Sequence, residues 1–477
     1  MEGGLKEKTA RGLLWGALNS GSTQLLNLIF GIILGRLLTP AEYGIVGVLS
    51  IFTLIAGNLQ SSGFTQALVN LKAPRNEDYT AVFWFNTLTS FVLYALLFLS
   101  APLIAQFFHQ PCLVEVSRFV FLSFVISSFG IAHNAYMTKN MMNRELAIIG
   151  AIALLCSGGV ATFLAFYGFS YWSLAWQQII YITVLNIGRY YYTPWRPSWH
   201  FTFEPVRKMF GFSVKILITN IINTLSNNIL TLLFGRLYPI KAVGDYSQAY
   251  KWNTMASAFV ANAVGQVAQP VLASVKEEHG RSVRVFRKML RFTAFLSFPA
   301  MFGLAIISNE FILLTIGKRW LDAVPLLQML CIGGAFVPFY TLYQNVAISN
   351  GRSDFYMFCN IAQIVLQLVI IAFFYHLGIN TMVMVYTLFT IAWLFVWQWI
   401  AHRIIGLRFW EVIKDVMPTQ CIALLVMATT YFVTLPLHHL LLLLICRILI
   451  AALLYAAIMK LLHVEMMDEL LLFIKKR

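Results

Sequence analysis

Two stretches of the sequence, LGRLLTPAEYG (Leu34–Gly44) and FGRLYPIKAVGDY (Phe234–Tyr246), share one pattern and lie 200 residues apart. In each, Gly-Arg-Leu ends a long apolar run and is followed by Pro and then by Gly. Gly and Pro are the residues that most often punctuate regular elements. The repetition predicts two related halves, each of which begins with an apolar helix and the same short loop.

The composition is typical of an integral membrane protein. Hydrophobic residues make up 59% of the 477 residues, charged residues make up only 11%, and the mean hydropathy is +0.75. Soluble domains carry roughly 25% charged residues. Because a water-soluble chain of this length has no interior large enough for so much apolar surface, we expect most of the surface to face lipid.

Fourteen apolar runs are long enough to cross a bilayer, since a spanning helix needs about 20 mostly apolar residues. The runs are Gly12–Leu34, Gly44–Leu68, Tyr79–Leu103, Val114–Met137, Leu146–Gly168, Tyr171–Tyr191, Phe212–Phe234, Val243–Leu272, Phe292–Ile316, Val324–Ser349, Phe355–His376, Met382–Ala401, Met417–Leu435 and Leu440–Leu462. The sequence therefore predicts an all-α integral membrane protein with about 14 transmembrane helices.

The distribution of Lys and Arg predicts the orientation. With a cytoplasmic N-terminus, 25 of the 34 Lys and Arg residues fall in cytoplasmic segments and six fall outside. We therefore expect both termini in the cytoplasm. The net charge of +15 is accounted for by this topology and by contact with anionic lipid, so it does not call for a nucleic-acid partner.

Motifs for catalysis are missing from the sequence. It contains no GxxxxGK[ST], no HExxH and no GxSxG, and no group of residues with the spacing of metal ligands. The expected outer loops are short, and the first offers only Glu42 as an acidic residue. We therefore expect a transporter with no catalytic residues and no metal site, rather than an enzyme.

The repeat extends backward from the Gly-Arg-Leu loops into the helices before them. Ser20, Thr23 and Asn27 align at the same offset with Asn220, Asn223 and Asn227. Positions i, i+3 and i+7 share a helix face, so each helix carries a polar stripe, which either lines a cavity or bonds neighbouring helices. A second match links HNAYM (His133–Met137) to QNVAI (Gln344–Ile348). The sequence thus predicts parallel repeats: six-helix bundles over residues 1–191 and 212–403, a cytoplasmic linker and hinge over 192–211, and two helices with a cytoplasmic tail over 404–477.

Four stretches carry a resemblance to a known family: GRLLTPAEYGIVGV, SSGFTQALVN, YSQAYKW and GKRWLDAVPLLQML. With these, nearly the whole chain resembles Wzx-type polysaccharide flippases of the multidrug/oligosaccharidyl-lipid/polysaccharide exporter superfamily, in the branch of the colanic and teichuronic acid exporters. The resemblance implies two six-helix bundles around a central cavity, plus two extra helices, in the bacterial cytoplasmic (inner) membrane.

The resemblance also implies an activity. Such proteins flip undecaprenyl-diphosphate-linked oligosaccharide from the cytoplasmic to the outer leaflet, for O-antigen, capsule or exopolysaccharide assembly. Alternating access driven by an ion gradient is implied, with H⁺ or Na⁺ as the coupling ion and no other cofactor. The implied partners are the lipid-linked oligosaccharide, membrane lipids, and a polysaccharide polymerase and co-polymerase.

Cations within the apolar runs are candidate substrate-binding residues, because an ionised group at membrane depth costs about 2.5–3.5 kcal/mol or more. Lys215, Lys251 and Arg447 are in this position. Lys215 and Arg447 lie near helix ends, so snorkelling to the membrane surface is the alternative. For Lys251 the alternative is a buried salt bridge with Asp245, six residues earlier.

Arg36 and Arg236 occupy equivalent outer positions in the two halves, against the general charge bias. One interpretation is that each cation stabilises a helix C-terminus through the helix dipole. The hypothesis is that the pair forms an outer gate or receives the substrate diphosphate.

A cytoplasmic basic patch of Arg284, Arg287, Lys288 and Arg291 falls on one helical face. It is read either as an amphipathic surface helix on anionic lipid or as a docking site for the diphosphate. Carboxylates that might hold a coupling ion are few and lie near helix ends, among them Glu42, Glu115, Asp245 and Glu310, and the sequence assigns none of them an ion site.

Two other function classes stay open. A multidrug or small-cation extruder of the same superfamily should carry acidic residues at membrane depth, whereas this chain carries mostly cations there. A membrane glycan polymerase or ligase is disfavoured by the short outer loops.

Overall fold

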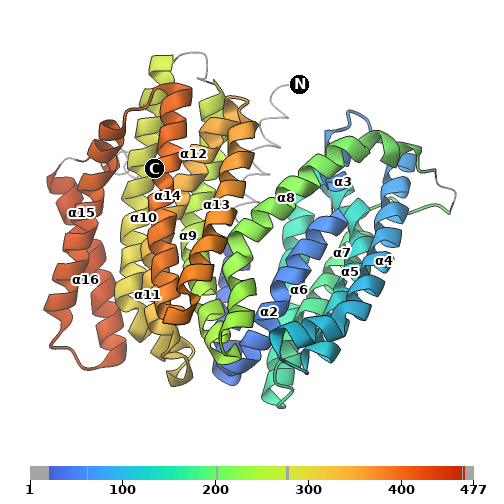
Figure 1. Ribbon diagram of the computed structural model, residues 1–477, viewed down its shortest axis with the longest axis horizontal. Coiled ribbons are helices and arrows are strands. Elements are labelled where there is room, and N and C mark those ends of the chain that lie inside the picture. Colours follow the sequence, from blue (N-terminus) through green and yellow to red (C-terminus); the bar gives the residue numbers. More distant parts are fainter. Residues whose placement is uncertain are drawn as a thin grey trace. The chain divides into compact units, whose positions relative to one another are not determined.

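The computed structural model describes residues 21–61, 63–199, 202–274, 279–462, 464 and 466–467, and throughout these residues the secondary structure is helical, without strands. The chain forms two compact units, Met1–Gly244 and Asp245–Arg477. Figure 1 shows the helices of each unit running roughly side by side. The predicted all-helical class is thus confirmed.

The first unit is built from eight described helices. They are Gly21–Leu37, α2 (Pro40–Ser61), α3 (Phe64–Asn70), α4 (Asn76–Phe108), α5 (Leu113–Lys139), α6 (Asn143–Phe166), α7 (Trp172–Tyr192) and α8 (Glu204–Leu237). Within the unit, α5 packs against α4 and α7, and α8 packs against α2 and α4.

The second unit begins within α9 (Ile240–Ser274). The elements that follow are α10 (His279–Thr315), η1 (Lys318–Trp320), α11 (Ala323–Gly334), α12 (Val337–Ser349), α13 (Ser353–Phe374), η2 (Tyr375–Leu377), α14 (Ile379–Ile405), α15 (Phe409–Thr434) and α16 (Leu440–Leu461). Helix α10 packs against α11, α15 and α16, so it is the central helix of this unit.

Each predicted apolar run overlaps a helix of the structure. In the part of the chain that the structure describes, nine helical segments are long and apolar enough to cross a membrane. The second run is split into α2 and α3, because Gly63 between them adopts a left-handed conformation with φ 72°. The total of 14 spans and the internal repeat stay predictions.

The linker between the predicted bundles is an ordered part of the first unit. Trp195 is buried in a cluster with residues of α3, α4, α5 and α8. The indole Nε1 of Trp84 donates to the Ser198 carbonyl over 2.8 Å, and the rings of Trp84 and Trp199 lie 5.0 Å apart. These contacts fix the described part of the linker to the helix ends of this unit, so it does not have the structure of a free hinge.

Helix α10 is much longer than a membrane span requires. Its 37 residues extend about 55 Å at 1.5 Å per residue, against a hydrocarbon thickness of about 30 Å. The basic patch lies in its first turns. The patch is thus continuous with the apolar part of α10, and its contact with anionic lipid or with a diphosphate stays a prediction.

Candidate functional site

The two Gly-Arg-Leu stretches meet within the first unit, at the N-termini of α2 and α9. A Cβ atom at Gly44 would overlap the carbonyl of Ile240, and a Cβ atom at Gly244 would overlap the carbonyl of Pro40. The contact is reciprocal, because Pro40 and Gly44 correspond to Ile240 and Gly244 at the offset of 200 residues. Glycine is required at both positions, since any side chain would separate the two helix ends.

Arg36 and Arg236 each lie four residues before a contact residue, Pro40 and Ile240, and both arginine side chains are exposed. Arg236 lies against the C-terminus of α4, where its Nη1 is 2.9 Å from His109 Nε2 and its guanidinium is 5.4 Å from the centre of the Phe107 ring. Arg36 is on the helix that ends at Leu37. Their proposed joint role as a gate stays a prediction.

The polar stripes are described in part. Thr23, Asn27 and Asn220 are half-buried. Ser20 lies outside the described residues. The side chains of Asn223, Asn227 and Lys215 on α8 also lie outside the description, so the cavity role assigned to these residues stays a prediction.

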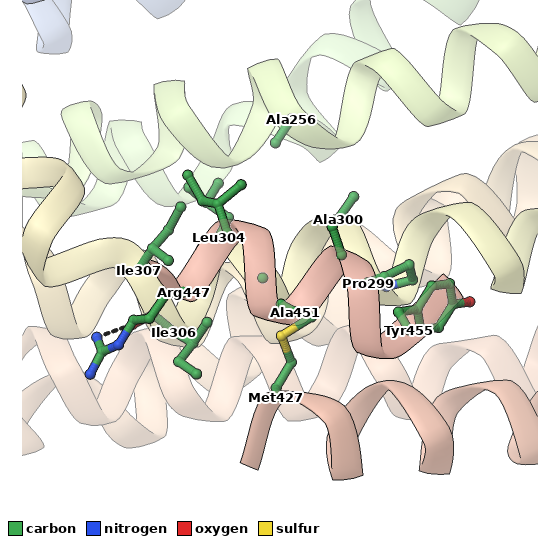
Figure 2. Close-up of a pocket in the computed structure, with 13 residues that line it drawn as sticks. Ala256, Pro299, Ala300, Leu304, Ile306, Ile307, Met427, Arg447, Ala451 and Tyr455 are labelled. Atoms are coloured by element: carbon green, nitrogen blue, oxygen red, sulfur yellow. Dashed lines mark hydrogen bonds between the residues drawn. The ribbon is translucent and has the colours of Figure 1, made fainter. Parts of the chain in front are cut away.

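A cavity of about 550 Å³ lies in the second unit between α9, α10, α15 and α16. Its lining is mostly aliphatic, with Leu304, Ile307, Met427 and Ala451 among the residues (Figure 2). Arg447 supplies a charged group on its wall. A space of this kind accommodates a hydrocarbon chain far better than a sugar, because it offers few polar partners.

Arg447 is held inside the protein by a network of hydrogen bonds. Its Nη1 lies 2.7 Å from the Glu310 carboxylate and 3.0 Å from the Ile306 carbonyl, to both of which it donates. Its Nε donates to the Thr434 hydroxyl over 3.2 Å. The side chains of Arg447 and Glu310 are 7% and 5% exposed. Snorkelling of Arg447 to the membrane surface is therefore wrong, and a carboxylate from α10 compensates its charge instead.

Lys251 lies half-buried on α9, with its Nζ 5.5 Å from the centre of the Trp252 ring. Asp245 is buried on the same helix. Residues six apart on an α-helix point about 120° away from each other, so the helix does not place this pair face to face. A cavity role for Lys251 stays a prediction.

Within the basic patch on α10, Arg287 forms ion pairs with α15. Arg287 donates from Nε to Asp415 over 2.6 Å and from Nη1 to Glu411 over 3.1 Å, both on α15. Arg284 and Lys288 are exposed, and Arg291 is half-buried. Arg287 thus fixes the start of α15 to α10.

Sequence reasoning singled out Arg447 and Glu310 but did not join them. They are 137 residues apart, and nothing in either local sequence names the partner. The same holds for Arg287 with Asp415. The only signal in the sequence is that charged residues are rare within the apolar runs. Each charge that does occur there needs an opposite charge nearby, but the sequence does not say which residue provides it.

Helices of membrane length, a buried ion pair and an apolar cavity together define a helical integral membrane protein. A family model described as "Polysaccharide biosynthesis protein" matches residues 33–325, which is more than half of the sequence, and the chain belongs to that family.

Two curated proteins and one solved structure extend this result. The chain is 25% identical to the teichuronic acid biosynthesis protein TuaB of Bacillus subtilis, over 83% of this chain and 80% of that protein. It is 26% identical to the lipopolysaccharide biosynthesis protein WzxC of Escherichia coli, over 69% and 68%. The lipid II flippase MurJ in an inward closed conformation has the same fold, with a TM-score of 0.73 at 13% identity, over 94% and 99%. The resemblance to Wzx-type polysaccharide flippases is thereby confirmed.

Proposed function

We propose that the protein flips a lipid-linked oligosaccharide, carried on undecaprenyl diphosphate, from the cytoplasmic to the outer leaflet of the bacterial inner membrane. One observation carries this proposal: the family and relatives are named for polysaccharide biosynthesis, while the fold is that of a lipid flippase. The step of polysaccharide biosynthesis that requires a flippase is the transfer of a lipid-linked glycan across the membrane.

The cavity of the second unit supports the lipid part of this substrate. Its aliphatic wall suits a hydrocarbon chain, and it lies in the unit where α15 and α16 pack on α10. The sugar part needs polar groups, for which the half-buried Asn27 and Asn220 are the described candidates. In this scheme the 14 helices form two repeats with cytoplasmic termini.

Alternating access is part of the proposal, and the reciprocal glycine contact supports it. Gly44 and Gly244 allow two helix N-termini to close directly on each other's backbone, without side chains between them. We expect this contact to open when the outer side opens. Coupling to H⁺ or Na⁺ also belongs to the proposal; Glu310, a buried carboxylate, is already engaged by Arg447.

Deletion of the gene in its native host tests the function. We expect surface polysaccharide to fall and the lipid-linked oligosaccharide to accumulate in the inner leaflet, where an impermeant glycosidase added to spheroplasts does not reach it. The wild-type gene restores both. An accumulated intermediate that the glycosidase does reach indicates a polymerase or ligase defect instead and contradicts flipping. Normal surface polysaccharide with a change only in drug tolerance favours the extruder.

A further inference from the structure

A cluster at one end of the first unit is not used by the proposed function. It joins His133 on α5, Arg189 and Tyr190 at the end of α7, and Trp195 and Arg196 in the linker. His133 lies six residues before Lys139, the last residue of α5, or about 9 Å along the helix. In the predicted orientation this end of the unit lies at the cytoplasmic headgroup level.

His133 is buried without a hydrogen-bond partner. It is 1% exposed, its ring stacks on Tyr190 at 5.3 Å, and it meets the Trp195 ring edge-on at 4.8 Å. Within the part of the chain that the structure describes, neither of its ring nitrogens has a partner and neither does the Trp195 Nε1, although all three atoms are enclosed. Because each imidazole carries at least one N–H, these residues present at least two unsatisfied donors. An enclosed donor without an acceptor lowers stability, because it has lost its hydrogen bond to water.

Arg189 adds a cation to the same place. Its Nη1 lies 3.1 Å from the position of a Cβ on Gly130, one helical turn before His133, and its Nε is enclosed without a partner. The Asn186 side chain fills the rest of the space over Gly130, with its Nδ2 directed at the Ile126 carbonyl. Glycine at position 130 therefore leaves room for the Arg189 guanidinium beside α5.

Arg196 brings a second guanidinium from the linker. Its Nη1 donates to the Trp195 carbonyl over 2.8 Å and to the Thr193 carbonyl, and its guanidinium lies 3.9 Å from the centre of the Tyr190 ring. The residue is exposed, so the cluster opens to the surface on this side. Tyr190 thus has the His133 ring and the Arg196 guanidinium against it.

Among the described residues, neither Arg189 nor Arg196 pairs with a carboxylate. Arg447 and Arg287, by contrast, each pair with one or two. Burying an ion without a counter-charge is unfavourable, and this applies to the half-buried Arg189. An anion with several acceptor oxygens would satisfy both guanidinium groups and the unsatisfied His133 and Trp195 donors, and phosphate matches the planar fork of Arg best.

We propose that His133, Arg189, Trp195 and Arg196 form a binding site for the phosphate group of a lipid in the cytoplasmic leaflet. Basic pockets between helices on the cytoplasmic side are the usual places for lipid phosphates. The phosphate comes either from an anionic phospholipid or from a polyprenyl diphosphate. Only the second source rests on the proposed function.

Binding to the full-length protein in phosphatidylcholine nanodiscs tests the site. The probes are inorganic pyrophosphate, a polyprenyl diphosphate and phosphatidylglycerol. For the variant R189Q/R196Q, we expect Kd for the preferred probe to rise by about tenfold or more, because each charge-assisted hydrogen bond is worth about 1.5–3 kcal/mol. The control K72Q/R207Q removes two exposed cations of the same unit and should keep the wild-type Kd.

The probes separate the two sources, since tighter binding of the polyprenyl diphosphate identifies the carrier lipid and tighter binding of phosphatidylglycerol identifies a phospholipid. R196Q alone changes an exposed residue, so it keeps the test valid if the double variant does not fold, and we expect it to raise Kd severalfold. Wild-type affinity for all three probes in the folded variants overturns the site. Failure of the gene deletion to trap the intermediate, with phosphate binding intact, overturns the proposed function but not this site.

Discussion

Arg447 and Arg189 both lie on apolar helices, yet their surroundings are opposite. Arg447 in the second unit meets Glu310 at 2.7 Å and two further oxygen acceptors. Arg189 in the first unit lies beside Gly130, and its enclosed Nε has no partner among the residues that the structure describes. The first guanidinium is neutralised by a carboxylate of the fold, while the second has no carboxylate partner among the described residues.

The difference teaches which cations to assign to structure and which to ligands. A buried charge whose partner is in the chain makes the fold depend on that partner, so removing one member is costly. A partly buried charge without a partner lowers stability, and its presence is best explained by an external anion. This criterion gives Arg447 and Arg287 structural roles, and it agrees with the binding role proposed for Arg189.

The largest expected effect on stability comes from breaking the ion pair between Arg447 and Glu310. Glu310→Leu leaves Arg447 buried without a counter-charge, and we expect the free energy of unfolding to fall by about 3–5 kcal/mol. The double variant E310L/R447L should regain most of this loss, because both charges are removed together. Melting temperatures of the purified protein measure both effects.

Transport by the stable double variant then decides the role of the pair. Wild-type output of surface polysaccharide means that Arg447 has a structural role only. An inactive but stable protein means that Arg447 also contacts the substrate. Equal melting temperatures for E310L and the wild type would contradict the structural assignment.

A second variant gives Arg189 a carboxylate partner, as Arg447 already has. Asn186→Asp places a carboxylate beside Arg189, since both side chains lie over Gly130. We expect Kd for the phosphate probe to rise by about tenfold, because the internal carboxylate competes with the ligand for the guanidinium.

Asn140→Asp is the matched control for this change. Asn140 is exposed, and its Nδ2 also donates to a backbone carbonyl, that of Tyr136. The control therefore has the same change of charge and loses the same type of bond, away from the cluster. Equal Kd values for N186D and N140D would contradict a binding role for Arg189.

The sequence was sufficient for the helices and insufficient for their long-range contacts. Apolar runs predict helices because a spanning segment needs about 20 such residues, whatever packs around it. The break at Gly63 depends on a left-handed conformation that a run of hydropathy does not show. The packing of Trp195 into the first unit depends on four different helices, so the linker sequence alone indicated a hinge.

The candidate site follows the same division. Charge within an apolar run identified Arg447, and the repeat identified His133 as part of HNAYM. Their partners lie on other helices, at separations such as the 137 residues between Glu310 and Arg447. The sequence indicates that a charge within an apolar run needs an opposite charge nearby. Only the fold shows which residue supplies that opposite charge.

Arg287 is an intermediate case, with 30% of its side chain exposed and Asp415 5% exposed. Arg287→Gln should lower the free energy of unfolding by about 1 kcal/mol, since water screens the arginine but Asp415 loses its partner. Thermal unfolding measures the change, with Arg284→Gln as the control, because Arg284 is exposed and donates only to a backbone carbonyl. A loss as large as that of E310L would show that exposure does not set the cost of an unpaired charge.

The smallest effect on stability is expected for the two exposed arginines of the Gly-Arg-Leu loops. Arg236 contacts the His109 ring at the protein surface, and Arg36 is also exposed. The variant R36A/R236A should change the free energy of unfolding by no more than about 0.5 kcal/mol. If the two arginines form the outer gate or receive the diphosphate, surface polysaccharide should nevertheless fall. Normal polysaccharide output at a normal protein level would remove the gate hypothesis and leave these arginines as partners of their helix ends, because a helix C-terminus favours a cation whether or not a substrate passes.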